Sequence, residues 1–482
     1  MDDDACVASQ CRRSAFTISP YLTPSSIYSV SIFFSPLAGR NKKTPSPPTP
    51  KDPNLPSMAA MADWSSLPSE LVRRIADCLL ETNDLDCYMD FRAVCPNWCS
   101  ATEDPKNSSE PRFRPRRWII IDEVFQSDSR LLVNTLSGRV VRKNLPQPLL
   151  REFYVVATTH GGFFVLADKE PPHAAVVLNP FTGYMIRFNA AVPFYIEVFS
   201  AALSGLVTEK LLKSSAVSEL RSSPTLVLLW DEFYEQHMAV PDSDRFTQEV
   251  NEQDVSSFML LRLAIAGGIC ATDDWLRRAE PLPAALVHKI SYLMKLFAID
   301  PYKMFSDKLA TRIADLHNPR RFDENHLYLV ESAGDLLAII KTRQHLKVFR
   351  LGNLTGSDVV EPVKSIGDRA VFIGHRMCLS VTASKFPSLV ANCVYYVGLT
   401  LDIYKYDLET GEEERVSKAI YPLKSNAVSF PNPPFTIVQL LSSYTVNVRE
   451  SQLAVEKLML HLFARATPFE LDCCSSDSDL EY

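Results

Sequence analysis

A strand–turn–glycine phrase that recurs along the chain limits the possible folds most strongly. The phrase ends at Gly138, again at Gly183, 45 residues later, and once more at Gly411. Each glycine follows a serine or threonine, and glycine adopts positive φ in such turns at the lowest cost. A lone hairpin is marginal in water, so units of this kind must pack on one another. Short-stranded repeats of roughly 40 to 50 residues indicate an all-β propeller.

The predicted propeller covers residues 118–465, which has room for roughly seven or eight units of this period. The phrase itself marks three units, so the sequence leaves the number of blades open. Residues 231–254 are acidic and are expected to form an exposed loop, and residues 283–297 fit a helix as well as a strand. The predicted strands are residues 118–122, 130–134, 140–141, 163–168, 175–179, 185–186, 226–230, 296–300, 327–331, 336–340, 346–350, 370–374, 393–396 and 403–407.

Residues 63–101 have a different, helical periodicity. Ser66 is a candidate N-cap and Pro68 suits a first helical turn. Apolar residues then recur at helical spacing, and Asn83-Asp84 can end this helix and cap the next. Three short helices are predicted, and a unit of this size cannot bury a full core alone, so a partner is expected. The apolar residues of the first helix are Leu71, Val72, Ile75 and Leu79.

The remaining segments are predicted to lie outside these two domains. Residues 1–60 are rich in serine and proline and are expected to be disordered. Met58 and Met61 are alternative translation starts to Met1. Residues 102–117 are interpreted as a solvated linker, and residues 466–482 as an acidic, serine-rich tail.

Composition excludes several classes of partner for this chain of 482 residues. Its net charge is −7, whereas nucleic-acid binding needs a basic surface, so no nucleic acid is expected. No apolar run reaches the roughly 18 residues of a membrane helix, so no membrane span is expected either. The eleven cysteines form no CxxC pair, which fits reduced thiols in the cytoplasm or nucleus.

No catalytic or metal-binding motif is found. The sequence contains no GxSxG, P-loop, HExxH or GxGxxG pattern, so neither a catalytic residue nor a cofactor is predicted. The nine histidines make no spaced pair, and no metal site is expected. Residues 159–162, Thr-His-Gly-Gly, are interpreted as a tight turn before a strand, and His375 as a loop or cap residue.

The predicted helical stretch resembles an F-box. The matching residues are Leu67, Pro68, Glu70, Leu71, Ile75, Val94, Cys95 and Trp98, while Pro96-Asn97 stands where that family often has a basic residue. The resemblance implies docking on a Skp-type linker and, through it, a cullin. The residues expected to make this contact are Leu67, Pro68, Leu71, Ile75, Val94, Cys95 and Trp98.

A second resemblance covers the last third of the chain. Residues 331–341, 348–352, 365–374, 379–389, 392–398 and 406–411 are similar to the C-terminal domain of plant F-box proteins with a KIB-type β-propeller. Together the two resemblances imply a multidomain chain, with a small all-α F-box followed by an all-β propeller.

These resemblances imply a non-catalytic adaptor of an SCF-type ubiquitin ligase, whose propeller binds an unidentified protein substrate. The alternative is a propeller-only binding or structural protein, possibly in an organelle, whose F-box-like helices have lost their partner. A propeller hydrolase is the third class, and it would need converging acid, base or metal groups in the central channel.

Overall fold

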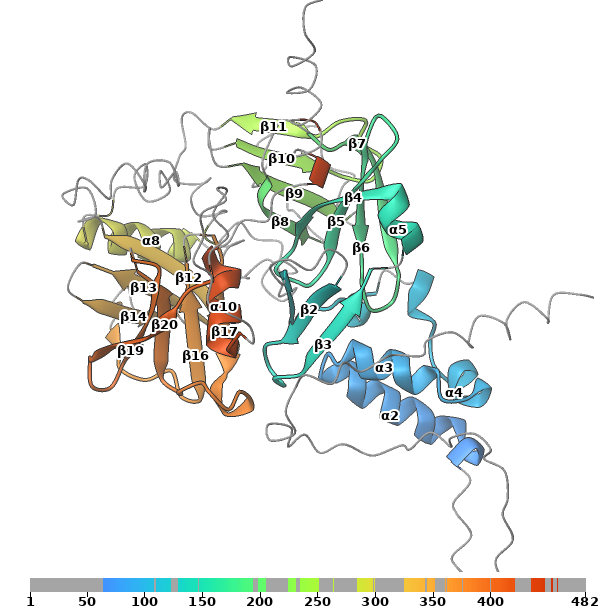
Figure 1. Ribbon diagram of the computed structural model, residues 1–482, viewed down its shortest axis with the longest axis horizontal. Helices are drawn as coiled ribbons and strands as arrows, with labels where there is room; N and C mark the ends of the chain where they lie inside the picture. Colours follow the sequence, from blue (N-terminus) through green and yellow to red (C-terminus); the bar gives the residue numbers. More distant parts are fainter. Residues whose placement is uncertain are drawn as a thin grey trace, which may run out of the picture. The chain divides into compact units, whose positions relative to one another are not determined.

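The computed structural model divides the chain into two compact units, Met1–Asp104 and Pro105–Tyr482 (Figure 1). It shows no helix with the length and apolar character needed to cross a bilayer within the residues it describes. The predicted N-terminal extension and acidic tail, and His375, lie outside these residues. The described residues are 64–107, 110–122, 129–145, 147–193, 198–204, 224–230, 235–250, 263, 284–297, 299, 325–342, 345–351, 360, 362–374, 376–398, 400–420, 435–446, 452, 453 and 457.

The first unit contains the three predicted helices, α2 (Ser69–Glu81), α3 (Leu85–Arg92) and α4 (Pro96–Ala101). Asp84 caps α3 as predicted, because its side chain accepts a hydrogen bond from the Cys87 backbone N–H at 3.3 Å. The predicted N-cap Ser66 is wrong. Ser66 ends a preceding 3₁₀ turn, η2 (Trp64–Ser66), and Pro68 takes the N-cap position of α2 without a side-chain cap.

The second unit contains five sheets in chain order among the described residues. Sheet 1 consists of β1 (Trp118–Asp122), β2 (Ser129–Asn134) and β3 (Val140–Asn144). Sheet 2 consists of β4 (Phe153–Thr158), β5 (Phe164–Asp168), β6 (Ala174–Leu178) and β7 (Met185–Ala191). Sheet 3 consists of β8 (Val198–Ser204), β9 (Thr225–Trp230), β10 (Glu235–Ala239) and β11 (Thr247–Val250).

Sheets 4 and 5 follow after the irregular middle of the chain. Sheet 4 consists of β12 (His326–Ser332), β13 (Asp335–Lys341), β14 (Leu346–Arg350) and β15 (Pro362–Val363). Sheet 5 has the order β17-β16-β18-β19-β20, and its β16 and β18 run parallel. Its strands are β16 (Arg369–Ile373), β17 (Cys378–Thr382), β18 (Cys393–Val397), β19 (Asp402–Asp407) and β20 (Glu413–Lys418).

Further helices flank the sheets. They are η3 (Pro105–Asn107), η4 (Pro111–Phe113), α5 (Gln147–Glu152), α8 (Ala284–Leu296), η7 (Ala383–Lys385) and α10 (Ile437–Val446). Helix α8 packs its buried Ile290 and Leu293 on sheet 4. Helix α10 packs against β1, β16 and β18.

The recurring phrase folds as the same turn in sheets 1, 2 and 5, which confirms the repeat. Its first side chain, Asn134, Asn179 or Asp407, accepts hydrogen bonds from the backbone N–H groups two and three residues later. The glycine N–H donates back to the backbone carbonyl of that first residue, and the glycine φ is 73° or 74°. In all three sheets the turn joins the last two strands. When sheets 1 and 2 are aligned on this turn, β3 corresponds to β7, β2 to β6, and β1 to β5, the second strand of sheet 2.

Contacts between sheets place them around one axis. The first strands of sheets 2 and 3, β4 and β8, lie side by side, as do β12 of sheet 4 and β17 of sheet 5. Buried clusters join sheets 2 and 3, sheets 4 and 5, and sheets 5 and 1. Sheet 1 also meets sheet 2, because Trp118 and Phe181 pack with ring centroids 4.7 Å apart. The order of neighbours is therefore 3-2-1-5-4.

Three further predictions from the sequence are wrong. The expected loop at residues 231–254 contains β10 and β11, since β10 pairs with β9 and β11 pairs with β10, which holds these polar segments as strands. The predicted strand at 296–300 is not found in its described residues, because α8 continues to Leu296, and residues 298 and 300 lie outside the described chain. The helical alternative for residues 283–297 is confirmed. The linker at 102–117 is not a solvated hinge, because Phe113 is buried and its carbonyl accepts a hydrogen bond from Asn179 Nδ2 at 2.8 Å.

Candidate functional site

Helix α2 carries apolar residues on two faces, of which one is buried in its own unit. Val72, Ala76 and Leu80, spaced four residues apart, are buried. Leu71 and Ile75, on another face, are 45% and 41% exposed. The sequence predicted one apolar face, whereas the structure separates a core face from an exposed one. Exposed large apolar side chains that lie together mark interaction surfaces.

The predicted docking residues fall into three groups. Leu71, Ile75 and Val94, the last 50% exposed, are open to a partner, and Pro68 is also exposed. Leu67 and Cys95 are half-buried. Trp98 is only 2% exposed. Leu71 and Ile75 share one side of α2, and Val94 follows α3. For brevity we call these three exposed residues the exposed apolar face, a name that refers to their exposure and implies no contact between Val94 and the other two.

Trp98 belongs to the internal core of the helical unit. Its ring packs on Phe91 with centroids 4.4 Å apart, and its Nε1–H donates to the Trp64 backbone carbonyl at 3.1 Å. Both contacts lie inside the unit, so Trp98 holds η2 and α3 against α4. The sequence placed Trp98 at the docking contact because an aromatic residue on a short helix suits a core and an interface equally well.

Two features support the geometry of α4. Pro96 occupies the first turn of α4. A backbone N–H in this turn would have no partner within the helix, so proline loses nothing by lacking one, and its fixed φ favours the helix. Buried Arg92, which the sequence did not single out, donates from Nη1 to the carbonyls of Thr102, at 2.6 Å, and Glu103. These bonds tie the end of α3 to the chain that follows α4.

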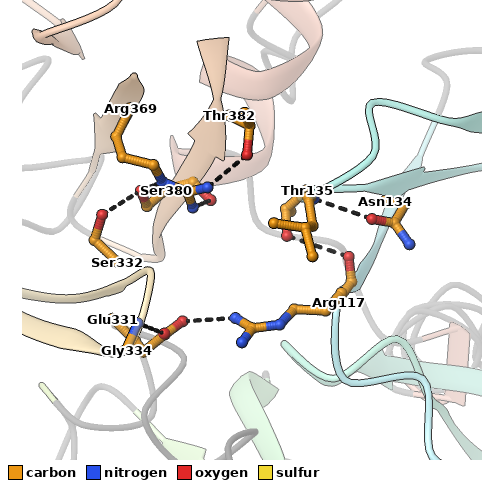
Figure 2. Close-up of polar contacts among 10 residues, drawn as sticks. Arg117, Asn134, Thr135, Glu331, Ser332, Gly334, Arg369, Ser380 and Thr382 are labelled. Atoms are coloured by element: carbon orange, nitrogen blue, oxygen red, sulfur yellow. Dashed lines mark hydrogen bonds and ion pairs between the residues drawn. The ribbon is translucent and has the colours of Figure 1, made fainter. Parts of the chain in front are cut away.

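A second candidate site is a polar network where sheets 1, 4 and 5 meet (Figure 2). Arg117, just before β1, lies 3.1 Å from the Glu331 carboxylate at the end of β12. The other Glu331 oxygen accepts a hydrogen bond from the Gly334 backbone N–H at 2.8 Å. The pair therefore joins sheet 1 directly to the β12–β13 turn of sheet 4.

Arg369 organises the sheet 5 side of the network. Its guanidinium donates to Ser380 Oγ at 3.0 Å, to the Ser380 carbonyl at 2.8 Å and to Thr382 Oγ1 at 2.7 Å. Ser380 in turn hydrogen-bonds Ser332 of β12 at 2.7 Å. Burial lowers the pKa of Arg369 and nearby Glu331 opposes the shift, but a guanidinium stays protonated in proteins.

The turn of sheet 1 completes the network. The Thr382 backbone N–H donates to the Thr135 carbonyl at 3.1 Å, and the Thr135 N–H donates to the Arg117 carbonyl at 2.8 Å. Because these donors and acceptors pair with protein groups of three sheets, the network serves to join the sheets. The sequence missed it, since the contacts that join sheet 1 to the other two sheets, Arg117 with Glu331 and Thr135 with Thr382, span more than 200 residues of the chain.

Glu331→Gln is expected to lower the free energy of unfolding of the propeller by about 1–2 kcal/mol, because Arg117 and Arg369 lose their shared carboxylate. Asp335→Asn is the matched control, since it makes the same acid-to-amide change in the half-exposed pair with Arg350, 3.0 Å away. It should cost no more than about 0.5 kcal/mol. Urea unfolding of both variants checks this, and equal losses would contradict the structural role of the network.

Several half-buried or buried titratable groups elsewhere are held in neutral forms. Burial lowers the pKa of His160 to about 4, and its Nδ1 hydrogen-bonds Tyr444 Oη at 2.9 Å. Burial raises the pKa of Cys378 to about 12 and that of Cys393 to about 11, so both thiols are protonated and poorly nucleophilic at neutral pH. The predicted tight turn at 159–162 is confirmed, because the Gly162 N–H donates to the Thr159 carbonyl.

No metal site is formed by the side chains that the structure describes. Within those ranges no three His, Cys, Asp or Glu side chains come together in a way that could hold an ion. Cys95, the N-cap residue of α4, and Cys99, four residues later on the helix, carry free thiols.

Five sheets of short strands, joined in chain order around one axis, define the second unit as a β-propeller. The family model of the KIB1-4 beta-propeller matches residues 132–421, more than half of the chain. The chain therefore belongs to the KIB1-4 beta-propeller family. A comparison with curated proteins finds no match.

Proposed function

We propose that this protein is a non-catalytic substrate adaptor of a cullin-based ubiquitin ligase. The helical unit would dock on a Skp-type linker, and the propeller would bind a protein substrate. The observation that carries the proposal is the exposed apolar face of an F-box-like helical unit that precedes a KIB1-4 beta-propeller. Holding a substrate near the transfer site raises its effective concentration there, which is the whole contribution of an adaptor.

The exposed apolar face has the character of a helix-docking interface. Three aliphatic side chains, two on α2 and one just after α3, remain exposed although the unit has a core of its own. Charged residues flank them on α2, including Glu70, Arg73 and Arg74. An apolar centre with a polar rim is the usual anatomy of a protein interface, and an all-α partner surface fits it by helix packing.

The positions of the other F-box-like residues refine the proposal. Trp98 would act indirectly, by holding the helices in place, and Leu67, Pro68 and Cys95 would lie at the edge of the contact. Pro96 suits the start of α4, so the departure from the family pattern at this position leaves the helix intact. The proposed docking centre is therefore Leu71, Ile75 and Val94.

The test is capture of the full chain by a purified plant Skp-type linker. Replacing Leu71 and Ile75 together by aspartate should reduce binding at least about 100-fold, because two charges would be buried in an apolar contact. Both residues are exposed, so the helical unit should stay folded in this variant. Surface plasmon resonance with the immobilised linker measures the loss.

The matched control is Arg73→Asp, which places aspartate at an exposed position on another side of the same helix. Its binding should stay within about threefold of wild type. Failure of the wild-type chain to bind, with the propeller folded, would overturn the ligase proposal. It would favour the alternative, a propeller binding or structural protein with a vestigial F-box.

In the proposed role the protein acts in the cytoplasm or nucleus and contacts neither nucleic acid nor a membrane. Its partners would be the Skp-type linker, the cullin bound through it, and one protein substrate. The neutral His160 and Cys378 suit a binding role, because neither group is poised as a base or nucleophile.

A further inference from the structure

We infer that the propeller is permanently plugged along its axis by its own C-terminal segment, so that ligands are recognised by its loops and not inside its channel. The axial plug consists of α10 together with Gln452 and Leu453. The inference rests on contacts that this segment makes with four of the five sheets. Propellers enclose a central channel on which all blades converge, so a segment that contacts four of them is best placed by a path across that channel.

The first half of the plug lies between sheets 1 and 5. Val438 and Leu441 of α10 are buried in the cluster that joins these two sheets. Near the end of the helix, the Thr445 carbonyl accepts backbone hydrogen bonds from Arg376, at 3.2 Å, and Met377, at 3.3 Å. Helix α10 also covers β1, the edge strand of the three-stranded sheet 1. An uncovered edge strand would be open to pairing with other chains.

The second half of the plug reaches sheets 2 and 3. Tyr444 hydrogen-bonds His160 in the β4–β5 turn at 2.9 Å. The Gln452 side-chain oxygen accepts a hydrogen bond from the Val155 backbone N–H at 2.8 Å, on β4, the first strand of sheet 2. Leu453 is fully buried in the cluster that joins sheets 2 and 3. The plug thus satisfies an inner-strand N–H that a channel ligand would otherwise meet.

Several bonds fix the start of the plug. Thr436 and Gln439 form a reciprocal capping box, in which the Gln439 N–H donates to Thr436 Oγ1 at 3.2 Å and the Thr436 N–H to Gln439 Oε1 at 2.9 Å. Gln439 Nε2 also donates to the carbonyl of Lys418, the last residue of β20, at 3.0 Å. Capping, coverage of an edge strand and burial of large apolar side chains are properties of a core element. A mobile lid, by contrast, has few buried apolar side chains and opens easily to solvent.

Amide hydrogen exchange of the full chain tests the inference. The amides of α10 should exchange within about tenfold of the rates of β16 and β18, because all three open only when the propeller unfolds. Leu441→Ala should raise the rates of α10 and of these strands together. Exchange of α10 at least about 100-fold faster than β16, in the wild-type chain, would show a lid that opens and would overturn the inference.

Cys378 gives an independent readout, because its buried thiol lies near Tyr444 of the plug. Under native conditions Cys378 should react with iodoacetamide only at the rate of propeller unfolding, and exposed Cys78 much faster, as read by peptide mass spectrometry. Fast labelling of both would overturn the inference. Neither measurement involves the Skp-type linker, so failure of the plug and failure of the ligase proposal are distinguishable.

Discussion

Trp98→Ala is expected to unfold the helical unit. Trp98 is fully buried, packs on Phe91 and holds the Trp64 carbonyl through its indole N–H. Truncating a buried aromatic side chain to alanine costs about 3–5 kcal/mol. A three-helix unit of this size has little more stability than that to lose. Hydrogen exchange of residues 69–101 should therefore approach the rate of an unfolded peptide.

Trp64→Ala is the matched control for this variant. Trp64 is 56% exposed, and its contribution to the Trp98 bond is a backbone carbonyl that alanine retains. The unit should stay folded, with a loss of no more than about 1 kcal/mol. If both variants behave alike, Trp98 is not the centre of the core. Linker binding separates the two roles further, because the Leu71 and Ile75 variant should lose binding with its helices intact.

Gly374→Ala is expected to destabilise the propeller by about 3 kcal/mol. A Cβ at this position would overlap the Thr445 backbone carbonyl far inside van der Waals contact. Since a backbone atom cannot rotate away, either the β16–β17 turn or α10 must move, and overpacking of this kind costs roughly 1–3 kcal/mol or more. The bonds from Arg376 and Met377 to Thr445 would be lost with that movement. Urea unfolding followed by far-ultraviolet circular dichroism measures the change.

Gly398→Ala is the control for Gly374→Ala. There a Cβ would meet the edge of the Tyr404 ring, 2.6 Å away, and a side chain of this kind can shift. The loss should be clearly smaller than for Gly374→Ala. An equal or larger loss at Gly398 would show that the packing of α10 on sheet 5 tolerates movement. It would also weaken the inference of a permanent axial plug.

Local patterns predicted much of the fold because their physical causes are local. The turn is stabilised by side-chain-to-backbone hydrogen bonds within five residues. The same short pattern at Asn134, Asn179 and Asp407 therefore predicts the same turn in all three sheets. Asp84 caps α3 for the same reason. The strands missed most clearly, β4 and β17, carry no such turn phrase, and their apolar runs are buried on both faces.

The candidate sites also divide into features that local sequence patterns predicted and features that depend on tertiary packing. The F-box-like pattern identified Leu71, Ile75 and Val94, but it could not separate them from Trp98, because burial depends on which helix packs where. The polar network and the axial plug were not predicted. The capping box at Thr436 and Gln439 was the one local signal that could have located α10.

The sequence by itself determined the kind of structure: a helical unit, then short strands with a repeated turn that only packed sheets can stabilise. Only the tertiary structure decided that there are five sheets in the described chain, and which face of α2 stays exposed. It also brought Arg117 to Glu331 and placed α10 between sheets 1 and 5. The physical reason is distance along the chain, since turns and caps involve neighbours, whereas closure of a ring joins residues that are hundreds of positions apart.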